Sequence, residues 1–242
     1  MLIREMCCAT DIGTVRRTNQ DSVAVFPKMK LAVLADGMGG HLAGEVASRK
    51  AIEVVRDAVS EGESIEEAVV RANAEVFALA EENSEYSGMG TTLVAASYDG
   101  FKLKIVNVGD SRLYRYRKGI LEQVTVDQTV AQELRDRGLE HKNGKHISTY
   151  EHVLTNALGI QKECGLSVSN DVVQPGDVHL LCSDGLTGVL DDELVSGMLA
   201  KHEGVLEGML QTLISTALQR AAPDNISAAM IRSKLPTRKV EK

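Results

Sequence analysis

"LAVLADGMGGHLAGEVAS", residues 31–48, joins a short apolar run to an amphipathic segment through a glycine-rich turn. The apolar run is typical of a buried strand, and it ends on the carboxylate of Asp36. The residues that follow keep helical spacing in one apolar stripe: Ala43, Val46, Ala47, Ala51, Val54, Val55 and Ala58. Glycines beside the acid leave the backbone open to water, a metal or a substrate. The stretch predicts a strand that presents an acid, followed by a helix.

The rest of the chain alternates strand and helix patterns without a repeat or a linker. Strands are expected at about 4–10, 22–26, 31–35, 91–98, 101–107, 112–116, 120–125, 166–173, 177–183 and 225–232. Helices are expected at about 42–60, 65–83, 128–138, 191–200 and 204–221, the second opening with a capping box from Ser64 to Glu67. Hairpin-linked strands with a few long helices predict an α+β fold of antiparallel sheets covered by helices. Residues 139–153 show neither period, which is typical of a mobile surface segment.

Composition excludes several classes of protein. Of the 242 residues, 43% are hydrophobic and 25% charged, the profile of a soluble globular protein. The apolar runs are far shorter than the ~20 residues of a membrane helix, and Arg4 and Glu5 interrupt the place of a signal peptide. The formal net charge of −7 argues against nucleic acid as a partner. The four cysteines form no C-x-x-C pair, so we expect reduced thiols and a cytoplasmic protein.

Four acids stand at or just beyond the ends of expected strands: Asp36, Asp127, Asp184 and Asp224. Any one of them alone is more simply explained as a turn or a helix cap, and Asp127 before "QTVAQEL" suits an N-cap. If the strand ends converge, however, the carboxylates repel by several kcal/mol unless they share protons or hold a cation. Carboxylate oxygens suit Mg²⁺ or Mn²⁺. The competing interpretation, a dinucleotide-binding turn, is disfavoured because "GMGGHL" lacks the third glycine.

Eight stretches, in order, carry a resemblance to a known family. They are "DIGTVRRTNQDS" (11–22), "LADGMGGHLAGEVAS" (34–48), "GMGTTLVAA" (88–96), "VNVGDSRLYRY" (106–116), "VTVDQTVAQEL" (124–134), "VLTNALG" (153–159), "LLCSDGLTGVL" (180–190) and "DNISAAMI" (224–231). The chain resembles the metal-dependent protein phosphatases (the PPM or type 2C family) in their compact bacterial form. The resemblance implies one domain at residues 1–233, built as a four-layer α-β-β-α sandwich of two antiparallel sheets flanked by helices. It also implies a flap at about 139–153 and a basic tail at 234–242.

The resemblance further implies a metal site. Asp36 would bridge two Mn²⁺ or Mg²⁺ ions, the carbonyl of Gly37 would bind one of them, and Asp184 and Asp224 would bind the other. Asp127 would hold a third, weaker ion together with Asp184.

The resemblance assigns roles to residues around the metals as well. Arg16 would bind the phosphate, for which a planar guanidinium is suited because its fork matches two phosphate oxygens. Gln20 and Asp21 would orient water behind the metals. Asp110, in "VGDSR", is interpreted as structural.

Two positions depart from the family pattern. Many members have His where this chain has Met38, and Glu where it has Gln20. Because Met38 cannot donate a proton, the general acid is open between His41 and a water on the metals. The histidines at 141, 146 and 152 fall in the expected flap, either as solvated loop residues or in contact with a phosphoprotein.

The implied function is hydrolysis of phosphoserine and phosphothreonine by hydroxide bridging the metals, opposing a bacterial serine/threonine kinase. A cysteine phosphatase is excluded because no cysteine has an arginine six residues downstream. The alternative is a catalytically weak regulator that binds phosphoproteins with the same fold. The expected partners are phosphorylated proteins and the kinase, with no nucleic acid or membrane, and the expected form is a monomer.

Overall fold

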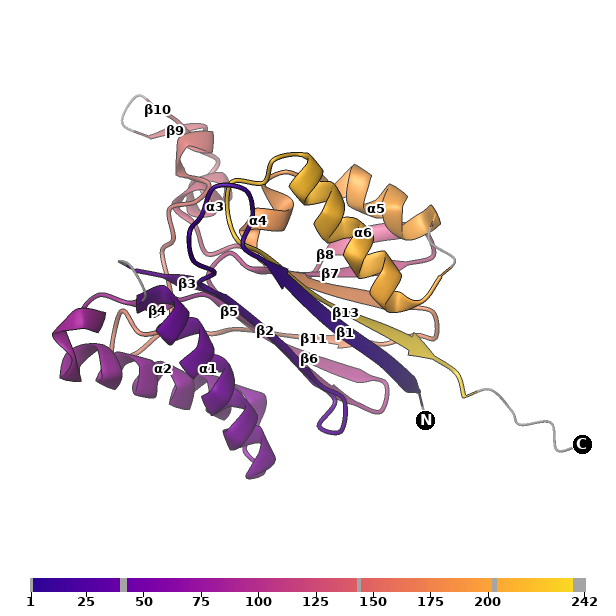
Figure 1. Ribbon diagram of the computed structural model, residues 1–242, viewed down its shortest axis with the longest axis horizontal. Coiled ribbons are helices and arrows are strands. Elements are labelled where there is room, and N and C mark those ends of the chain that lie inside the picture. The colour runs from indigo at the N-terminus through magenta and orange to yellow at the C-terminus, as the bar shows by residue number, and fades with distance from the viewer. Residues whose placement is uncertain (1, 40–42, 143–144, 202–203, 237–242) are drawn as a thin grey trace, which may run out of the picture.

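A computed structural model of the chain describes residues 2–39, 43–142, 145–201 and 204–236, and most of its strands form two antiparallel sheets (Figure 1). The first sheet has the spatial order β1, β13, β12, β7 and β8. Its strands are β1 (Ile3–Asp11), β7 (Arg112–Arg117), β8 (Ile120–Gln123), β12 (Val178–Cys182) and β13 (Ile226–Lys234). The second sheet has the order β11, β6, β5, β3 and β2, with β4 paired to the end of β3. Its strands are β2 (Asp21–Phe26), β3 (Leu31–Met38), β4 (Gly90–Thr91), β5 (Leu93–Asp99), β6 (Lys102–Val108) and β11 (Ser167–Val172).

Two pairs of helices cover the outer faces of the sheets (Figure 1). The helices α1 (Ala43–Ser60) and α2 (Ile65–Glu82) pack on the second sheet. The helices α5 (Asp192–Lys201) and α6 (Leu206–Gln219) pack on the first. The expected capping box opens α2, because Ser64 Oγ accepts the N–H of Glu67 while the Glu67 carboxylate accepts the N–H of Ser64. Among the described helices, none is both long and apolar enough to cross a lipid bilayer.

Alternation along β3 explains why its apolar run is uninterrupted. Leu31, Val33 and Ala35 face α1 and α2, while Ala32 and Leu34 face the first sheet. All five side chains are fully buried. Successive side chains of a strand point to opposite faces, so a strand covered on both faces needs apolar residues at every position. The predicted four-layer α-β-β-α sandwich is confirmed.

The short elements differ from the sequence-based expectation. The helix α3 (Val130–Asp136) is shorter than expected, and the structure adds α4 (Asp184–Thr187), η1 (Ser84–Tyr86), β9 (His141–Lys142), β10 (Lys145–His146) and η2 (Ile147–Tyr150). The last three lie within residues 139–153, for which the sequence predicts no regular structure. Elements of two to four residues are too short to show a period, so tertiary contacts decide them. Residues 237–242 of the expected tail lie outside the described residues.

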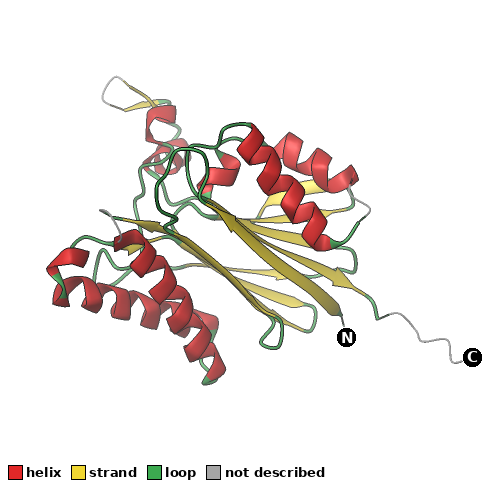
Figure 2. Cartoon of the chain, viewed as in Figure 1, coloured by secondary structure: helices red, strands yellow, loops and turns green. Residues whose placement is uncertain are grey.

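The longer connections between the strands gather with α3 and α4 at one end of the sandwich, while short hairpin turns close the other end (Figure 2). The strand β3 ends there, and α4 begins there directly after β12. The carboxylates expected at strand ends are thereby brought to one end of the molecule.

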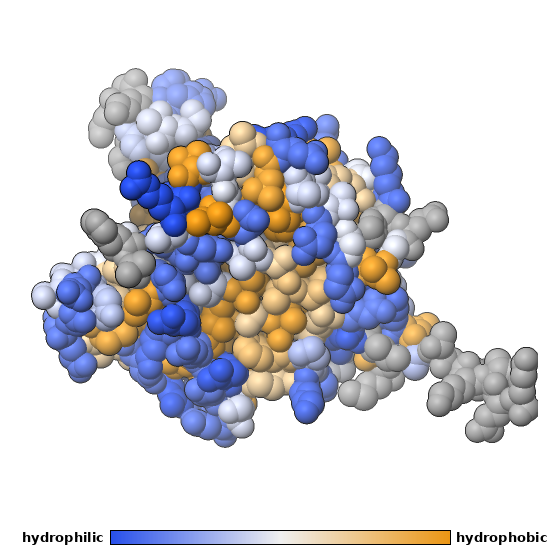
Figure 3. Space-filling view, viewed as in Figure 1, coloured by the Kyte–Doolittle hydropathy of each residue, from blue (hydrophilic) through white to orange (hydrophobic). Residues whose placement is uncertain are grey.

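The edge strands β1 and β2 close the two sheets against each other along one side of the sandwich. The thiol of Cys8 in β1 lies 3.9 Å from the carbonyl oxygen of Val23 in β2. Apolar side chains gather over these two strands between α1 and α6 (Figure 3). These two edge strands therefore present a partly exposed apolar face that lies apart from the end at which the acids meet.

Candidate active site

Asp36 is held near the end of β3 by the strand that follows α2. Its N–H donates to Thr92 Oγ1 at 3.0 Å, and its carbonyl oxygen accepts the N–H of Thr92 at 2.8 Å. The next residue, Gly37, touches α1 so closely that a Cβ there would lie 2.1 Å from the carbonyl oxygen of Gly44. Gly37 thus lets α1 pack directly against the end of β3.

Asp21 begins β2 and stands opposite Asp36 in the sheet register. Its side chain is buried, and Ser183 Oγ donates to its Oδ2 at 2.9 Å. Ser183 is itself fixed, since its Oγ accepts the N–H of Ser227 at 3.0 Å. The other carboxylate oxygen, Asp21 Oδ1, is buried without a hydrogen-bond partner. A buried carboxylate oxygen without a partner is costly unless a water or a cation reaches it.

Asp184 and Asp110 form a second group of ligand atoms. Asp184 is the first residue of α4, and Asp110 follows β6. Asp110, His152 and Asp184 each bring a ligand atom within 4.8 Å of one another. His152 Nδ1 lies 3.3 Å from Asp184 Oδ2, and this contact raises the pKa of His152 above its ordinary value. The three side chains could hold a metal ion.

Asp224 lies just before β13, where it meets Arg16. The guanidinium of Arg16 donates to Asp224 Oδ2 at 2.6 Å, and this hydrogen bond raises the pKa of Arg16. The second carboxylate oxygen of Asp224 accepts the N–H of Asn225 at 2.8 Å. An expected metal ligand and the expected phosphate-binding residue are therefore direct neighbours.

Asn225 fixes the loop that carries Arg16. Its Oδ1 accepts the N–H of Gln20 at 2.8 Å. Its Nδ2 donates to the carbonyl oxygens of Ile12 at 2.9 Å and Thr18 at 3.0 Å. One buried amide side chain thus makes three hydrogen bonds to the backbone on both sides of Arg16.

One cleft of about 570 Å³ collects the expected site. Its lining residues are Arg16, Gln20, Asp36, Gly37, Met38, Gly39, Thr92, Asp110, His152, Val153, Leu154, Asp184, Asp224 and Asn225. They include the four residues expected to hold two metals and the arginine expected to bind phosphate. Asp21 stands opposite Asp36 in the sheet register but is not among the lining residues, and His41, one of the two candidates for the general acid, lies outside the described residues.

The pKa values show how strongly the carboxylates in the cleft oppose one another. Burial, and then the charges of Asp21, Asp184, Asp110 and Asp224, raise the pKa of Asp36 well above its ordinary value. Burial raises the pKa of Asp21 to about 6 and that of Asp110 to about 7. Buried like charges of this kind are stabilised by a cation among them.

Asp184 behaves differently from its neighbours. Burial opposes its ionisation, but the hydrogen bond and charge of His152, a hydrogen bond with Asp36 and the charge of Arg16 together lower its pKa. The cleft thus combines a carboxylate whose pKa is lowered with carboxylates whose pKa values are raised. An all-oxygen donor set of carboxylates and one backbone carbonyl fits divalent Mg²⁺ or Mn²⁺.

Asp127 is engaged by other side chains. Its two oxygens accept hydrogen bonds from the Arg112 guanidinium, the shortest at 2.7 Å, and from Gln123 Nε2 at 2.9 Å. It lines a smaller adjoining pocket of about 210 Å³ together with Asp110 and Asp184. The expected role of Asp127 as a third-metal ligand stays a prediction, and the ion pair with Arg112 competes with it.

The alternative interpretation of Asp127 as a helix cap is wrong. The N-cap of α3 is Thr129, whose Oγ1 accepts the N–H of Gln132 at 3.2 Å. The helix begins at Val130 rather than at the expected residue 128, so the hydroxyl of Thr129 lies at the N-cap position.

Sequence reasoning gave Asp110 a structural role, left His152 as a solvated or substrate-contacting flap residue, and did not single out Asn225. Asp110 follows the strand pattern "KLKIVNV" at 102–108, the same arrangement of an apolar run and then an acid that singled out Asp36. That signal was available. His152 and Asn225 carry no comparable signal, because their partners lie 32 and up to 213 residues away in the chain.

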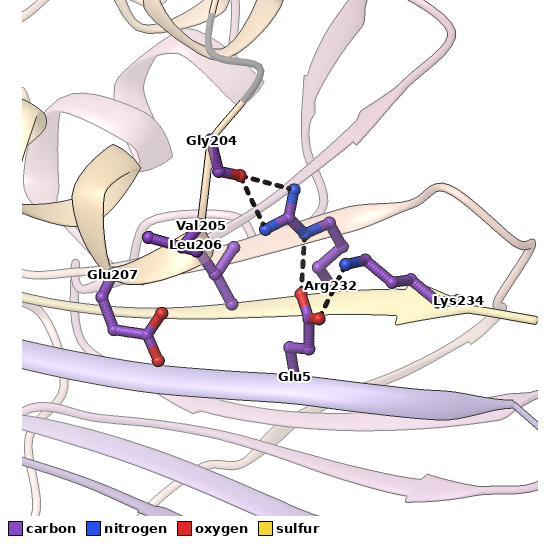
Figure 4. A pocket seen from close by; sticks show the side chains of 7 residues that line it. All are labelled: Glu5, Gly204, Val205, Leu206, Glu207, Arg232 and Lys234. Carbon is purple, nitrogen blue, oxygen red and sulfur yellow. Dashed lines mark hydrogen bonds and ion pairs between the residues drawn. The ribbon is translucent and has the colours of Figure 1, made fainter. Parts of the chain in front are cut away.

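A second hollow, of about 460 Å³, lies where β1 and β13 pass the start of α6. Its lining residues are Glu5, Gly204, Val205, Leu206, Glu207, Arg232 and Lys234 (Figure 4). Glu5 binds Arg232 at 3.1 Å and Lys234 at 2.7 Å, and the Arg232 guanidinium also donates to the carbonyl oxygen of Gly204. The charges there balance one another, so we place the chemistry in the acidic cleft.

Comparison with known proteins agrees with the geometry. The family model of protein phosphatase 2C matches residues 14–229. The serine/threonine phosphatase stp of Listeria innocua is 33% identical over 239 residues, which cover 93% of this chain and 94% of that protein. The serine/threonine protein phosphatase PstP of Mycobacterium tuberculosis is 37% identical over 236 residues, which cover 95% of this chain and 45% of that longer protein.

Solved structures show the same likeness. The catalytic domain of PstP, crystallised in complex with two manganese ions, matches with a TM-score of 0.86 at 33% identity. The match covers 97% of this chain and 100% of that domain. Similarity of this extent, in sequence and in structure, establishes that the chain belongs to the protein phosphatase 2C family.

Proposed function

We propose that this chain hydrolyses phosphoserine and phosphothreonine in proteins, with two Mn²⁺ or Mg²⁺ ions held by Asp36, Gly37, Asp184 and Asp224. The observation that carries the proposal is the convergence of buried carboxylates in one cleft, with an oxygen of Asp21 left without a partner. Relatives of the same domain are named serine/threonine phosphatases, and one of them binds two manganese ions. A regulator that only binds phosphoproteins is not favoured, since each expected metal acid is present.

The side chains around the acids have separate tasks. Divalent cations held in the cleft would supply positive charge to the phosphate oxygens and make water more acidic. Arg16, at the mouth of the cleft and half-exposed, keeps donors beyond its bond to Asp224 with which it orients the phosphate. Asp21, fixed by Ser183 and opposite Asp36, would orient water in the site.

A third, weaker ion is assigned to Asp110 and Asp184, with His152 as a neighbouring ligand. Asp110 replaces Asp127 in this proposal because the Asp127 carboxylate already accepts hydrogen bonds from Arg112. Asp127 then forms an ion pair with Arg112 at the wall of the site, and the two charges neutralise each other.

The leaving serine or threonine oxygen needs a proton that Met38 cannot supply. Met38 lines the cleft at the position where many family members have His. The proton donor is therefore either water in the cleft or His41.

We infer that the substrates are the phosphorylated targets of a serine/threonine kinase and that the chain works as a cytoplasmic monomer. The four cysteines are free thiols, as expected in a reducing compartment. One chain supplies all the proposed ligands of the cleft, so a second copy is not needed to complete it.

Initial rates on a phosphothreonine peptide and on p-nitrophenyl phosphate test the proposal. Activity should require Mn²⁺ or Mg²⁺, vanish in EDTA and return with excess Mn²⁺. Asp36→Asn should abolish turnover of both substrates without lowering the melting temperature in EDTA, because it removes one of several opposing charges. Full activity in EDTA would overturn the metal-dependent mechanism.

A further inference from the structure

A pocket of about 310 Å³ adjoins the catalytic cleft, and we name it the flanking pocket. Its lining residues are Met38, Leu154, Thr155, Asn156, Ala157, Ile160, Gln161, Glu163 and Gly165. Met38 and Leu154 line the catalytic cleft as well. The two hollows therefore adjoin each other at these two apolar side chains.

The shared wall is built over a glycine. A Cβ on Gly90 would lie 2.8 Å from both Met38 Cε and Ile160 Cδ1. The ends of these two apolar side chains thus lie together above the Gly90 backbone. Ile160 remains 42% exposed, although it borders a cleft rather than the core. An exposed apolar side chain in that place is suited to contact a substrate.

The far side of the flanking pocket is held by a buried amide in α2. Asn73 Oδ1 accepts the N–H of Gly159 at 2.9 Å, and Asn73 Nδ2 donates to the carbonyl oxygens of Gln161 at 3.1 Å and Lys162 at 3.0 Å. Asn73 is only 2% exposed. The loop that carries Ile160 is therefore ordered before any ligand binds, which lowers the entropic cost of binding.

Backbone pairing fixes the start of the same loop. Leu158 and Thr91 exchange two hydrogen bonds, at 2.9 and 3.0 Å. Thr91 directly follows Gly90 in β4 and stands opposite Gly37 in the register. The flanking pocket and the metal site thus share one rigid frame.

We propose that the flanking pocket takes an apolar side chain next to the phosphorylated residue of the substrate protein. The proposal rests on the phosphatase function assigned to the adjoining cleft. Met38, Leu154, Ala157 and Ile160 form the apolar part of a lining that also contains Thr155, Asn156, Gln161 and Glu163, and the exposed Ile160 beside Met38 is the part that an apolar side chain would contact. Glu163 is its one charged residue, so an acidic side chain is disfavoured there. Because Met38 borders both hollows, the occupant would lie near the phosphorylated residue rather than at a remote docking motif.

The test compares phosphothreonine peptides on an alanine background, with Leu or Asp placed at each flanking position in turn. At one position the kcat/KM for Leu should exceed that for Asp about tenfold, which corresponds to about 1.4 kcal/mol. Ile160→Asp should remove this preference by lowering kcat/KM for the Leu peptide, and Ile160→Leu should retain it. For each variant, the kcat/KM for a peptide is divided by the kcat/KM for p-nitrophenyl phosphate. This reference substrate is too small to fill both hollows.

Two further variants separate positioning from general effects. Asn73→Asp places a carboxylate against two carbonyl oxygens, so it should weaken the Leu preference through KM rather than kcat. The matched control is Phe101→Asp. Phe101 is a half-exposed apolar residue between β5 and β6, at the far end of the sheet, and its replacement should leave the preference unchanged.

The outcomes distinguish this proposal from the proposed function. If all peptides are hydrolysed at equal rates, or if Ile160→Asp keeps the Leu preference, the flanking pocket is not a substrate subsite, although the phosphatase function stands. If neither the peptides nor p-nitrophenyl phosphate is hydrolysed with Mn²⁺, the proposed function fails and the subsite falls with it.

Discussion

Replacement of Asp110 by Asn should stabilise the protein in EDTA at pH 8, although Asp110 is proposed to assist catalysis. The side chain is 7% exposed, and burial followed by the charges of Asp184 and Asp127 raises its pKa to about 7. Asn keeps the shape of the side chain and removes the charge. The variant therefore tests whether the acidic cleft stores unfavourable electrostatic energy that cations relieve.

The magnitude follows from the pKa of Asp110 in the two states. A carboxyl whose folded pKa is raised binds more protons in the folded state than in the unfolded chain, so its contribution to stability falls as the pH rises. The fall begins near the ordinary value of 3.8 and is complete above about 7. Each pKa unit is worth about 1.4 kcal/mol, so the ionised Asp110 lowers the free energy of unfolding by up to about 4 kcal/mol.

Urea unfolding in EDTA measures this difference directly. Asp110→Asn should exceed the wild type by about 4 kcal/mol at pH 8 and by about 2 kcal/mol at pH 5, where the folded wild-type carboxyl is protonated. Excess Mn²⁺ should shrink the difference, because bound cations offset the charge that the variant removes. The same variant should need more Mn²⁺ to reach full activity.

Asp127→Asn is the matched control, since it removes one carboxylate from the neighbouring wall. Asp127 is paired with Arg112, so its loss leaves a largely buried guanidinium without its partner. This variant should lower the free energy of unfolding by about 1–3 kcal/mol at pH 8. The reasoning is refuted if Asp110→Asn is no more stable than the wild type at pH 8 in EDTA, or if both variants shift stability in the same direction.

Three further changes test the frame of the site. Gly37→Ala should lower the melting temperature and weaken Mn²⁺ binding measured by calorimetry, because the new Cβ would strike the Gly44 carbonyl. The control Gly197→Ala, at an open position of α5, should leave stability unchanged or raise it. Arg16→Ala should chiefly raise KM for a phosphopeptide, and an unchanged KM would mean that Arg16 does not bind the phosphate. Asn225→Asp replaces the amide that donates to two backbone carbonyls with a carboxylate that can only accept, so the KM for a phosphopeptide should rise and the melting temperature should fall. Wild-type values for both would contradict the positioning role of Asn225.

Much of the fold could be predicted because its long elements are periodic. The run at 31–35 is apolar at every position, as a strand covered on both faces requires, and the stripe from Ala43 to Ala58 has the spacing of one helix face. The capping box at Ser64 was readable for the same reason, since its two partners are three residues apart. Signals of this kind are local, so a single sequence contains them in full.

The acids were also visible in the sequence, but their partners were not. Asp36, Asp184 and Asp224 each border a strand, and the structure brings them to one cleft. Asp127 shows the same local pattern, yet it meets Arg112 across the β7–β8 hairpin and leaves the place beside Asp184 to Asp110. Which carboxylate meets an arginine and which meets another acid depends on how the strands are ordered in the sheet.

Residue types and periods along the chain thus determined the strands, the helices and the presence of an acidic oxygen-rich site. Only the tertiary structure decided that Gly37 must be glycine because of α1, that Asn73 holds the loop of Ile160, and that Asn225 holds the loop of Arg16. The physical reason is distance along the chain. The energies of these contacts arise between groups that are 7 to 213 residues apart, and no local pattern records which distant group will lie within hydrogen-bonding range.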